Sequence, residues 1–204
     1  MNNIKSLFLV SVAATGLIVA GCSNPADDTE SAKVADAVSN VEAAVGAASY
    51  TISPDSKVSF VGSKVTGSHD GGFKAFDGMI AVADGKIVAP SKVTIQMNSI
   101  WSDSDRLTGH LMSPDFFDVE NIPTAEFAVT SMDGDEMTGN LTLHGVTKSI
   151  TFKPEVMITD SEVTMKAEFD IMRFDFDIVY KGKADDLIRD EVVIKLDVTA
   201  TKGA

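Results

Sequence analysis

Apolar and polar residues alternate along most of the chain after residue 50, which is the pattern of β-strands that bury one face. One clear run sets Val93, Ile95 and Met97 against polar neighbours. Similar runs lie near residues 125–130, 141–152, 163–171 and 191–199. The alternation therefore predicts a domain built from many short strands.

The parity of this alternation shifts at Met172 and Arg173. After the shift, Phe174, Phe176 and Ile178 take the apolar positions. Because a one-residue slip turns every side chain to the other face, a β-bulge is expected here to restore the register.

Turn-forming residues separate the runs at 70–72, 83–86, 132–135 and 144–145. Short strands joined by tight turns, without alternating helices, indicate an antiparallel meander closed into a barrel or folded as a sandwich. One interruption spans residues 102–123. Asp103 to Met112 is expected to form a short helix, and Ser113-Pro114 has the pattern that begins a second one. This helical excursion is suited to cover one end of a barrel.

Residues 23–49 consist mostly of Ala, Asp, Ser and Val and include no aromatic residue. Because this composition offers too little apolar bulk for a core, we expect residues 22–49 to be a flexible tether before a domain at 50–204. Four valines recur at helical spacing, which favours a weak amphipathic helix within the tether. They are Val34, Val38, Val41 and Val45.

The first residues follow the pattern of a bacterial export leader. Lys5 supplies the positive start, and Leu7 to Val19 form an uncharged apolar run that ends before Ala20-Gly21-Cys22. That run is too short to cross a bilayer, which needs about 20 apolar residues. We therefore expect residues 1–21 to be removed as a signal peptide.

The residues at 19–22, Val-Ala-Gly-Cys, resemble the lipobox of bacterial lipoproteins, in which the cysteine is acylated with chains such as palmitate. The alternative is an ordinary secretory signal with an incidental cysteine. Ser23, where an aspartate would favour retention, resembles the sorting signal for the outer membrane. The resemblance implies a protein held on the periplasmic side of a membrane through Cys22.

The charge balance narrows the classes of partner. The chain has 17 basic and 30 acidic residues and a formal charge of −13, which becomes −14 when Lys5 leaves with the leader. Such a chain repels phosphate backbones, so nucleic-acid binding is not expected. Cys22 is the only cysteine, so the domain has no internal disulfide and no other thiol.

Two segments carry a family resemblance. The first comprises residues 105–119, DRLTGHLMSPDFFDV, followed by residues 122–127, IPTAEF, and the second comprises residues 139–148, GNLTLHGVTK. Both resemble the hallmarks of YceI-like proteins. Only some members share the segments at 62–73 and 184–192, so this chain resembles a distinct branch, and we expect its ligand preference to differ from the usual one. The resemblance implies an all-β, lipocalin-like antiparallel barrel of about eight strands. It also implies a long isoprenoid ligand, such as a polyprenyl phosphate or a quinone, held inside.

Several apolar residues are candidates to contact such a ligand. Inward positions of strands could line a tunnel, and aromatic residues near the helical excursion could cover its opening. Each would look the same if it only filled a solid core, so this alternative stays open. The candidates are Met97, Ile100, Trp101, Phe116, Phe117, Phe127, Leu143, Phe152, Phe169, Phe174 and Phe176.

Polar candidates for a ligand head group are Arg106 and His110, near the excursion. A structural role explains each equally well, with Asp103 as a partner for Arg106. The three histidines, His69, His110 and His144, match no local metal-ligand spacing, so no metal site is expected. Three catalytic motifs, namely a nucleophile elbow, a phosphate loop and a zinc-protease helix, do not occur in the sequence.

These observations favour a non-enzymatic protein that binds, sequesters or transports an isoprenoid lipid, without a covalent cofactor. One alternative is a protein that presents a quinone to a membrane cytochrome, because some relatives are joined to cytochrome domains. Another is a solid-cored structural or stress protein without a ligand. A homodimer is a further expectation about partners.

Overall fold

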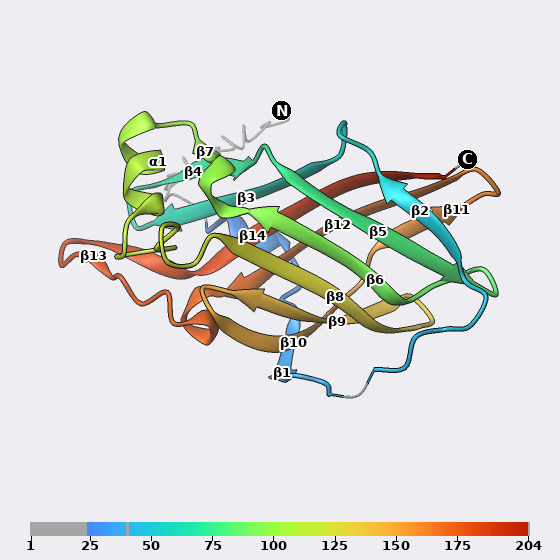
Figure 1. The fold of residues 1–204 in the computed structure, drawn as a ribbon. Coiled ribbons are helices and arrows are strands. Elements are labelled where there is room, and N and C mark those ends of the chain that lie inside the picture. Colours follow the sequence, from blue (N-terminus) through green and yellow to red (C-terminus); the bar gives the residue numbers. More distant parts are fainter. Residues whose placement is uncertain (1–23, 40, 204) are drawn as a thin grey trace, which may run out of the picture.

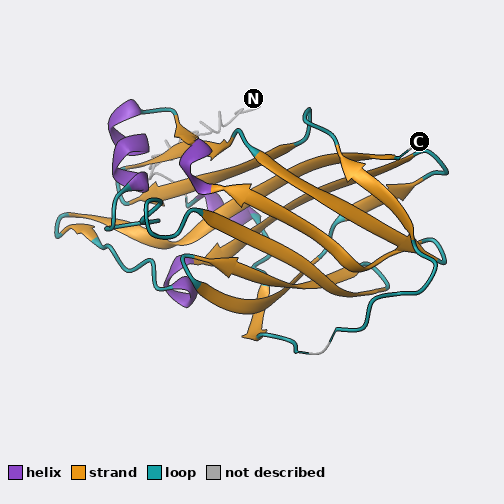
Figure 2. Cartoon of the chain, in the orientation of Figure 1, coloured by secondary structure: helices purple, strands orange, loops and turns teal. Residues whose placement is uncertain are grey.

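The computed structural model describes residues 24–39 and 41–203, and the expected leader and Cys22 lie outside the described residues. These residues form mainly antiparallel strands, with one α-helix and three short 3-10 helices (Figures 1 and 2). The predicted all-β antiparallel class is therefore confirmed. Within the described residues, no helix has the length and apolar character needed to cross a membrane.

The strands form one 14-stranded sheet that curls around an interior. Its main path runs β1-β10-β9-β8-β6-β5-β2-β14-β3-β4-β7, while β12 pairs with β11 and β14, and β13 pairs with β14. The strands are β1 (Lys33–Asp36), β2 (Ala48–Ile52), β3 (Lys57–Lys64), β4 (Gly67–Phe73), β5 (Phe76–Ala83), β6 (Lys86–Gln96), β7 (Ile100–Ser102), β8 (Thr124–Asp133), β9 (Glu136–Leu143), β10 (Val146–Phe152), β11 (Glu155–Ile158), β12 (Glu162–Met172), β13 (Gly182–Lys183) and β14 (Asp186–Lys202).

Both the expected strand number and the expected closure need correction. The sheet is not closed, and it has 14 strands rather than about eight. Four of the additional strands, β1, β7, β11 and β13, are only two to four residues long. Strands this short carry too few positions for a period-two signal, so the alternation could not reveal them.

The long strand β14 organises the sheet. Residues 191–201 of β14 pair with β12, while its other edge pairs with β3 and then with β2. Along β14, Val192, Ile194, Leu196 and Val198 turn toward the interior, as the alternation predicts. This strand therefore spans the interior almost from end to end.

The helical elements cluster mainly at one end of the molecule (Figure 2). They are η1 (Pro25–Asp28), η2 (Met97–Ser99), α1 (Asp105–Met112) and η3 (Arg173–Phe176). The hydroxyl of Ser104 accepts a hydrogen bond from the Leu107 amide and begins α1, close to the predicted start.

The second helix expected at Ser113-Pro114 is wrong, because the chain continues there in turns. The hydroxyl of Ser113 donates instead to the carbonyl of His110, at 2.7 Å. Ser113 thus ends α1, where it satisfies one of the free carbonyls of the last turn.

The bulge expected at Met172 and Arg173 is also wrong. The chain leaves β12 there through the 3-10 helix η3, and Asp177 closes this helix with φ 56°. The helix turns Phe174 outward, with 41% of it exposed, while Phe176 is fully buried. A helical turn breaks the alternation as a bulge would, so the sequence pattern did not separate the two.

The segment expected to be a flexible tether folds onto the sheet over much of its described length. Residues 33–36 form β1 and pair with β10, so the amphipathic helix suggested by the valine spacing is wrong. The isolated bridge between Ser31 and Asp170 joins the same segment to β12. The N-terminal segment thus lies between β10 and β12, two strands that do not pair with each other.

Candidate binding cavity

An apolar cavity of about 200 Å³ lies inside the curled sheet. Ten strands and α1 contribute residues to its wall, and among the described residues that line it only Arg173 carries a charge. The lining on β14 extends from Val192 to Val198, which corresponds to about 20 Å at the rise of a strand. The interior is therefore an elongated apolar space rather than a solid core.

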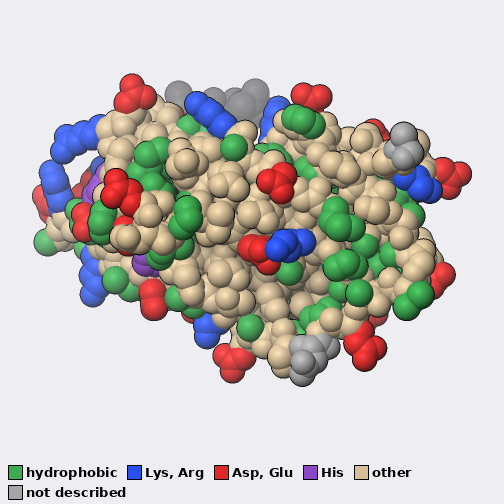
Figure 3. Space-filling model, viewed as in Figure 1, with side chains coloured by type: hydrophobic (Ala, Val, Ile, Leu, Met, Phe, Trp, Pro, Cys, Tyr) green, Lys and Arg blue, Asp and Glu red, His purple; other side chains and the backbone are tan. Residues whose placement is uncertain are grey.

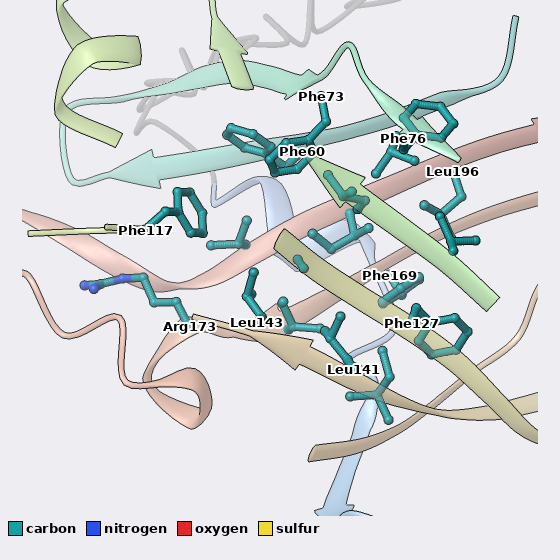
Figure 4. A pocket seen from close by; sticks show the side chains of 18 of the residues that line it. Phe60, Phe73, Phe76, Phe117, Phe127, Leu141, Leu143, Phe169, Arg173 and Leu196 are labelled. Carbon is teal, nitrogen blue, oxygen red and sulfur yellow. The ribbon is translucent and has the colours of Figure 1, made fainter. Parts of the chain in front are cut away.

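Aromatic rings shape the wall of the cavity (Figure 4). The rings of Phe152 and Phe169 stack with centroids 4.2 Å apart, and Phe127 lies 5.7 Å from Phe152. Phe127 can lie flat on β9 because Gly139 has no side chain: a Cβ there would come within 2.3 Å of the ring. These contacts give the middle of the cavity a wall of packed aromatic rings.

Residues of α1 and of the following turns cover one end of the cavity, which we call the helix end. Leu111, Phe116 and Phe117 line the cavity there. Behind Phe116, the ring of His110 lies edge-on to both Phe116 and Tyr180, with centroids 4.9 Å away in each case. We call α1 and the turns that follow it the cover. The ring cluster attaches this cover to the loop that follows η3.

The histidine in this cluster has a structural partner. His110 Nε2 lies 3.0 Å from a carboxylate oxygen of Asp115, within the same excursion. A hydrogen bond at this distance fixes the orientation of the imidazole ring between the two aromatic rings. His110 is therefore placed to hold the cover, and it does not line the cavity.

Arg173 brings a buried positive charge to the helix end. Only 3% of this residue is exposed, and Figure 4 shows its side chain beside Phe117. The guanidinium donates hydrogen bonds to the carbonyls of Ile178, Ile188 and Arg189. Within the described residues it forms no ion pair with a carboxylate, although the nearby Asp190 contributes a favourable field.

Burial lowers the pKa of the Arg173 guanidinium, and the field of Asp190 opposes this effect in part. A guanidinium nevertheless stays protonated in proteins, so the group remains a cation. Arg173 thus adds the apolar part of its side chain to the cavity wall, while its charged group lies behind this wall, bound to backbone carbonyls.

The profile of the YceI-like domain family matches residues 50–200. This chain belongs to the YceI-like family. The family segments noted in the sequence include α1 and the β9–β10 hairpin, whose turn residues His144 and Gly145 have positive φ angles. The turn predicted at this position is confirmed.

Two YceI-like relatives illustrate the similarity. A UPF0312 protein of Pseudomonas putida is 39% identical over 120 residues, which cover 52% of this chain and 61% of the relative. Protein YceI of Salmonella arizonae is 42% identical over 93 residues, which cover 43% of this chain and 48% of the relative. The matched part therefore spans about half to three-fifths of the length of these relatives.

Two solved structures share the fold. BcnA of Burkholderia cenocepacia aligns with a TM-score of 0.64 and 25% identity over 74% of this chain and 99% of BcnA. A polyisoprenoid binding domain from Saccharophagus degradans, implicated in plant cell wall breakdown, aligns with a TM-score of 0.63 and 17% identity. That alignment covers 77% of this chain and 99% of the domain.

The YceI-like fold places six of the eleven apolar candidates on the cavity wall. They are Phe116, Phe117, Phe127, Leu143, Phe152 and Phe169. Contact between these residues and a ligand stays a prediction. Their positions follow from the period-two alternation and, for Phe116 and Phe117, from the excursion.

Five apolar candidates do not line the cavity, namely Met97, Ile100, Trp101, Phe174 and Phe176, and their contact with a ligand stays a prediction. Met97 and Ile100 are buried in the core because the chain leaves β6 into η2 before Met97. Phe174 is exposed and Phe176 is buried, because η3 replaces a strand. Trp101 lines an adjoining hollow of about 490 Å³, which shares the lining residues Val58, Phe60, Phe73 and Phe76 with the cavity.

The polar candidates have other positions. Arg106 is exposed on α1 and does not line the cavity. His69 Nδ1 lies 2.7 Å from Asp103, and His144 Nδ1 lies 3.2 Å from the carbonyl of Phe176. Among the described residues, no group of three or more potential metal ligands comes together.

Sequence reasoning missed several wall residues. Phe60, Phe73, Phe76 and Leu196 line the cavity but were not among the candidates. Arg173 also lines the cavity, whereas the head-group candidates given above are Arg106 and His110. For Phe60 the signal was present, because Val58, Phe60 and Gly62 alternate with outward residues on β3.

Proposed function

We propose that this protein binds a long isoprenoid lipid in its cavity and sequesters or transports it without covalent chemistry. The observation that carries the proposal is the elongated apolar cavity, because a solid-cored structural protein would have filled this space. The family supports the proposal, as does the likeness of the fold to a domain described as polyisoprenoid binding.

Burial of the lipid tail would supply the affinity. Each isoprene unit brings about five carbons, and about 0.8 kcal/mol per buried carbon group gives roughly 4 kcal/mol per unit as an upper bound. The ordering of a flexible tail and the loss of translational freedom offset much of this gain. Tail length therefore sets the affinity, and contacts at the end of the cavity set the preference for a head group.

The head group is proposed to lie at the helix end, beside Arg173. A buried cation without an ion pair favours an anionic neighbour over a neutral one. Arg173 is the one charged residue among the described residues that line the cavity. A polyprenyl phosphate is thus a better match than a quinone, whose head is uncharged.

The proposed setting is the periplasmic side of a bacterial membrane, with the chain anchored through an acylated Cys22. The leader pattern and the lipobox-like residues 19–22 support this setting. Pairing with a membrane cytochrome and formation of a homodimer stay predictions.

Extraction of the purified protein with organic solvent, followed by mass spectrometry, tests the proposal. The expected result is a lipid with a repeating five-carbon mass pattern, in about equimolar amount. A protein that yields no such lipid, and that takes up neither polyprenyl phosphate nor quinone, would contradict it.

A further inference from the structure

Exposed apolar side chains gather at the helix end of the molecule. Val65, on the β3–β4 turn, is 54% exposed, and Leu187, at the start of β14, is 47% exposed. Val179, in the loop between η3 and β13, is 58% exposed. Figure 1 places the β3–β4 turn and β13 at the same end as α1. We call Val65, Val179 and Leu187 the apolar tips.

Two of the tips belong to one connected structure. The amide of Val65 donates to the carbonyl of Leu187 at 3.2 Å. Asp186 pairs with Lys64 and accepts a hydrogen bond of 2.9 Å from the hydroxyl of Thr66. Because these polar groups bond to one another, the valine and the leucine are the groups left to face outward.

The N-terminal segment begins its described course at the same end. The side-chain oxygen of Asn24 lies 3.5 Å from the hydroxyl of Ser63, which is buried on the outer face of β3. Ser63 is two residues from Val65, and Cys22 is two residues before Asn24. Two residues of chain span at most about 7 Å.

We propose that the apolar tips form a membrane-docking surface, which turns the helix end of the cavity toward the bilayer. The proposal rests on the proposed lipid-binding function, because it places the Arg173 end of the cavity next to the membrane that holds the ligand. An acyl chain on Cys22 would hold this end, and no other, at the bilayer surface. The tips then enter the interfacial region, where apolar side chains are favoured.

The charges at the helix end indicate which lipid composition is sufficient for docking. Figure 3 shows basic and acidic side chains together at this end, and in the sequence Lys181 and Lys183 are followed by Asp185 and Asp186. Because acidic side chains lie among the basic ones and the whole chain has a formal charge of −13, attraction to anionic lipid contributes little. Docking therefore depends on the apolar tips and proceeds on vesicles of phosphatidylcholine alone.

Site-specific fluorescence tests the docking surface on the mature chain from residue 22, which contains every described element. In a Cys22→Ser background, single cysteines replace Val65, Leu187 or Met157 and carry an environment-sensitive dye. Met157 is the control, since it is 66% exposed on β11, toward the opposite end. With phosphatidylcholine vesicles, the dye should shift to the blue at positions 65 and 187 and stay unchanged at position 157.

A second measurement uses charge substitutions. The pair Val65→Asp and Leu187→Asp should lower the vesicle-bound fraction at least tenfold in flotation, whereas Met157→Asp should not. Uptake of polyprenyl phosphate from detergent should be equal in all three proteins. Equal dye shifts at all positions, no shift at any position, or association of the tips with a second copy in light scattering would overturn the docking surface. Loss of lipid uptake by the unaltered protein would instead contradict the proposed function.

Discussion

The carboxylate of Asp170 on β12 accepts a hydrogen bond of 2.7 Å from the hydroxyl of Thr29, a residue 141 positions earlier in the chain. Ser31 donates a second hydroxyl hydrogen bond of 2.8 Å to the other oxygen. The backbone carbonyl of Asp170 accepts from the Ala32 amide at 2.8 Å. Since Asp170 is only 1% exposed, these contacts stabilise a buried carboxylate and fasten the N-terminal segment to the sheet.

Asp170→Ala should release this segment. The substitution removes two hydrogen bonds to a charged acceptor, one from the half-buried Thr29 and one from the exposed Ser31, so the free energy of unfolding should fall by about 1–3 kcal/mol. Limited proteolysis should then cut within residues 24–39, and denaturant unfolding measures the stability. Asp197→Ala on the neighbouring strand β14 is the matched control, since Asp197 forms only an exposed ion pair with Lys166 at 3.6 Å. Equal effects of the two substitutions would refute the role given to Asp170.

Gly62→Leu should block the cavity without disturbing the sheet. Gly62 lines the cavity on β3, and a Cβ at this position would meet no atom within 4 Å. The added side chain therefore occupies the space proposed for the lipid tail. Bound isoprenoid, measured by mass spectrometry of the extract, should fall at least tenfold while the far-ultraviolet circular dichroism stays unchanged.

Gly109→Leu is the control for this experiment. A Cβ at Gly109 also meets open space, but it lies on the exposed surface of α1. Lipid binding should therefore be retained, and the helix should gain stability from the loss of a glycine. If Gly62→Leu binds as much lipid as Gly109→Leu, the tail does not occupy this cavity.

Arg173→Met should lower both stability and head-group preference. Methionine keeps the apolar stem but leaves the carbonyls of Ile178, Ile188 and Arg189 without their donor. We expect a loss of about 2–4 kcal/mol in the free energy of unfolding. Competition between polyprenyl phosphate and polyprenol should show a preference for the phosphate that the substitution abolishes.

Arg189→Met provides the comparison. Its Nε is buried and, within the described part of the chain, has no hydrogen-bond partner. Removing an unpaired polar group costs little, so this protein should stay more stable than Arg173→Met and should keep the head-group preference. An unchanged preference in Arg173→Met would show that the cation serves the fold alone.

The alternation of apolar and polar residues predicted the strands that carry the cavity, because each presents one face to the interior over many residues. Phe127, Phe152 and Phe169 could be placed on the wall for this reason. The same pattern does not show whether the inward side chains of facing strands contact one another or leave a cavity between them. The cavity is therefore a property of the packed sheet and not of any one strand.

Other features depend on partners far away in the sequence. The N-terminal segment has little apolar bulk, and its attachment depends on Asp170 in a strand that the sequence does not mark as its neighbour. Arg173 sits where the alternation breaks, and its three acceptors are backbone carbonyls, which have no sequence signature. Period and composition could reveal neither contact.

The pair formed by His69 and Asp103 predicts a pH-dependent attachment of the cover. The His69 ring contacts one carboxylate oxygen of Asp103 at 2.7 Å, and the Asp70 amide donates to the other at 3.1 Å. The hydrogen bond from His69 lowers the pKa of Asp103 below the ordinary value of 3.8. Asp103 lies just before α1, so this pair joins β4 to the start of the excursion.

A carboxylate whose pKa is lower in the folded state stabilises that state above its unfolded pKa, and this contribution is lost as the pH falls through the folded value. Nuclear magnetic resonance titration of the Asp103 carboxyl carbon should therefore give a midpoint below 3.8, and His69→Asn should raise it toward 3.8. Because both side chains are about two-fifths exposed, high salt should weaken the effect. A midpoint that does not respond to His69→Asn would show that the imidazole leaves the titration of Asp103 unchanged, and that the cover is held by other contacts, such as those between His110 and Tyr180.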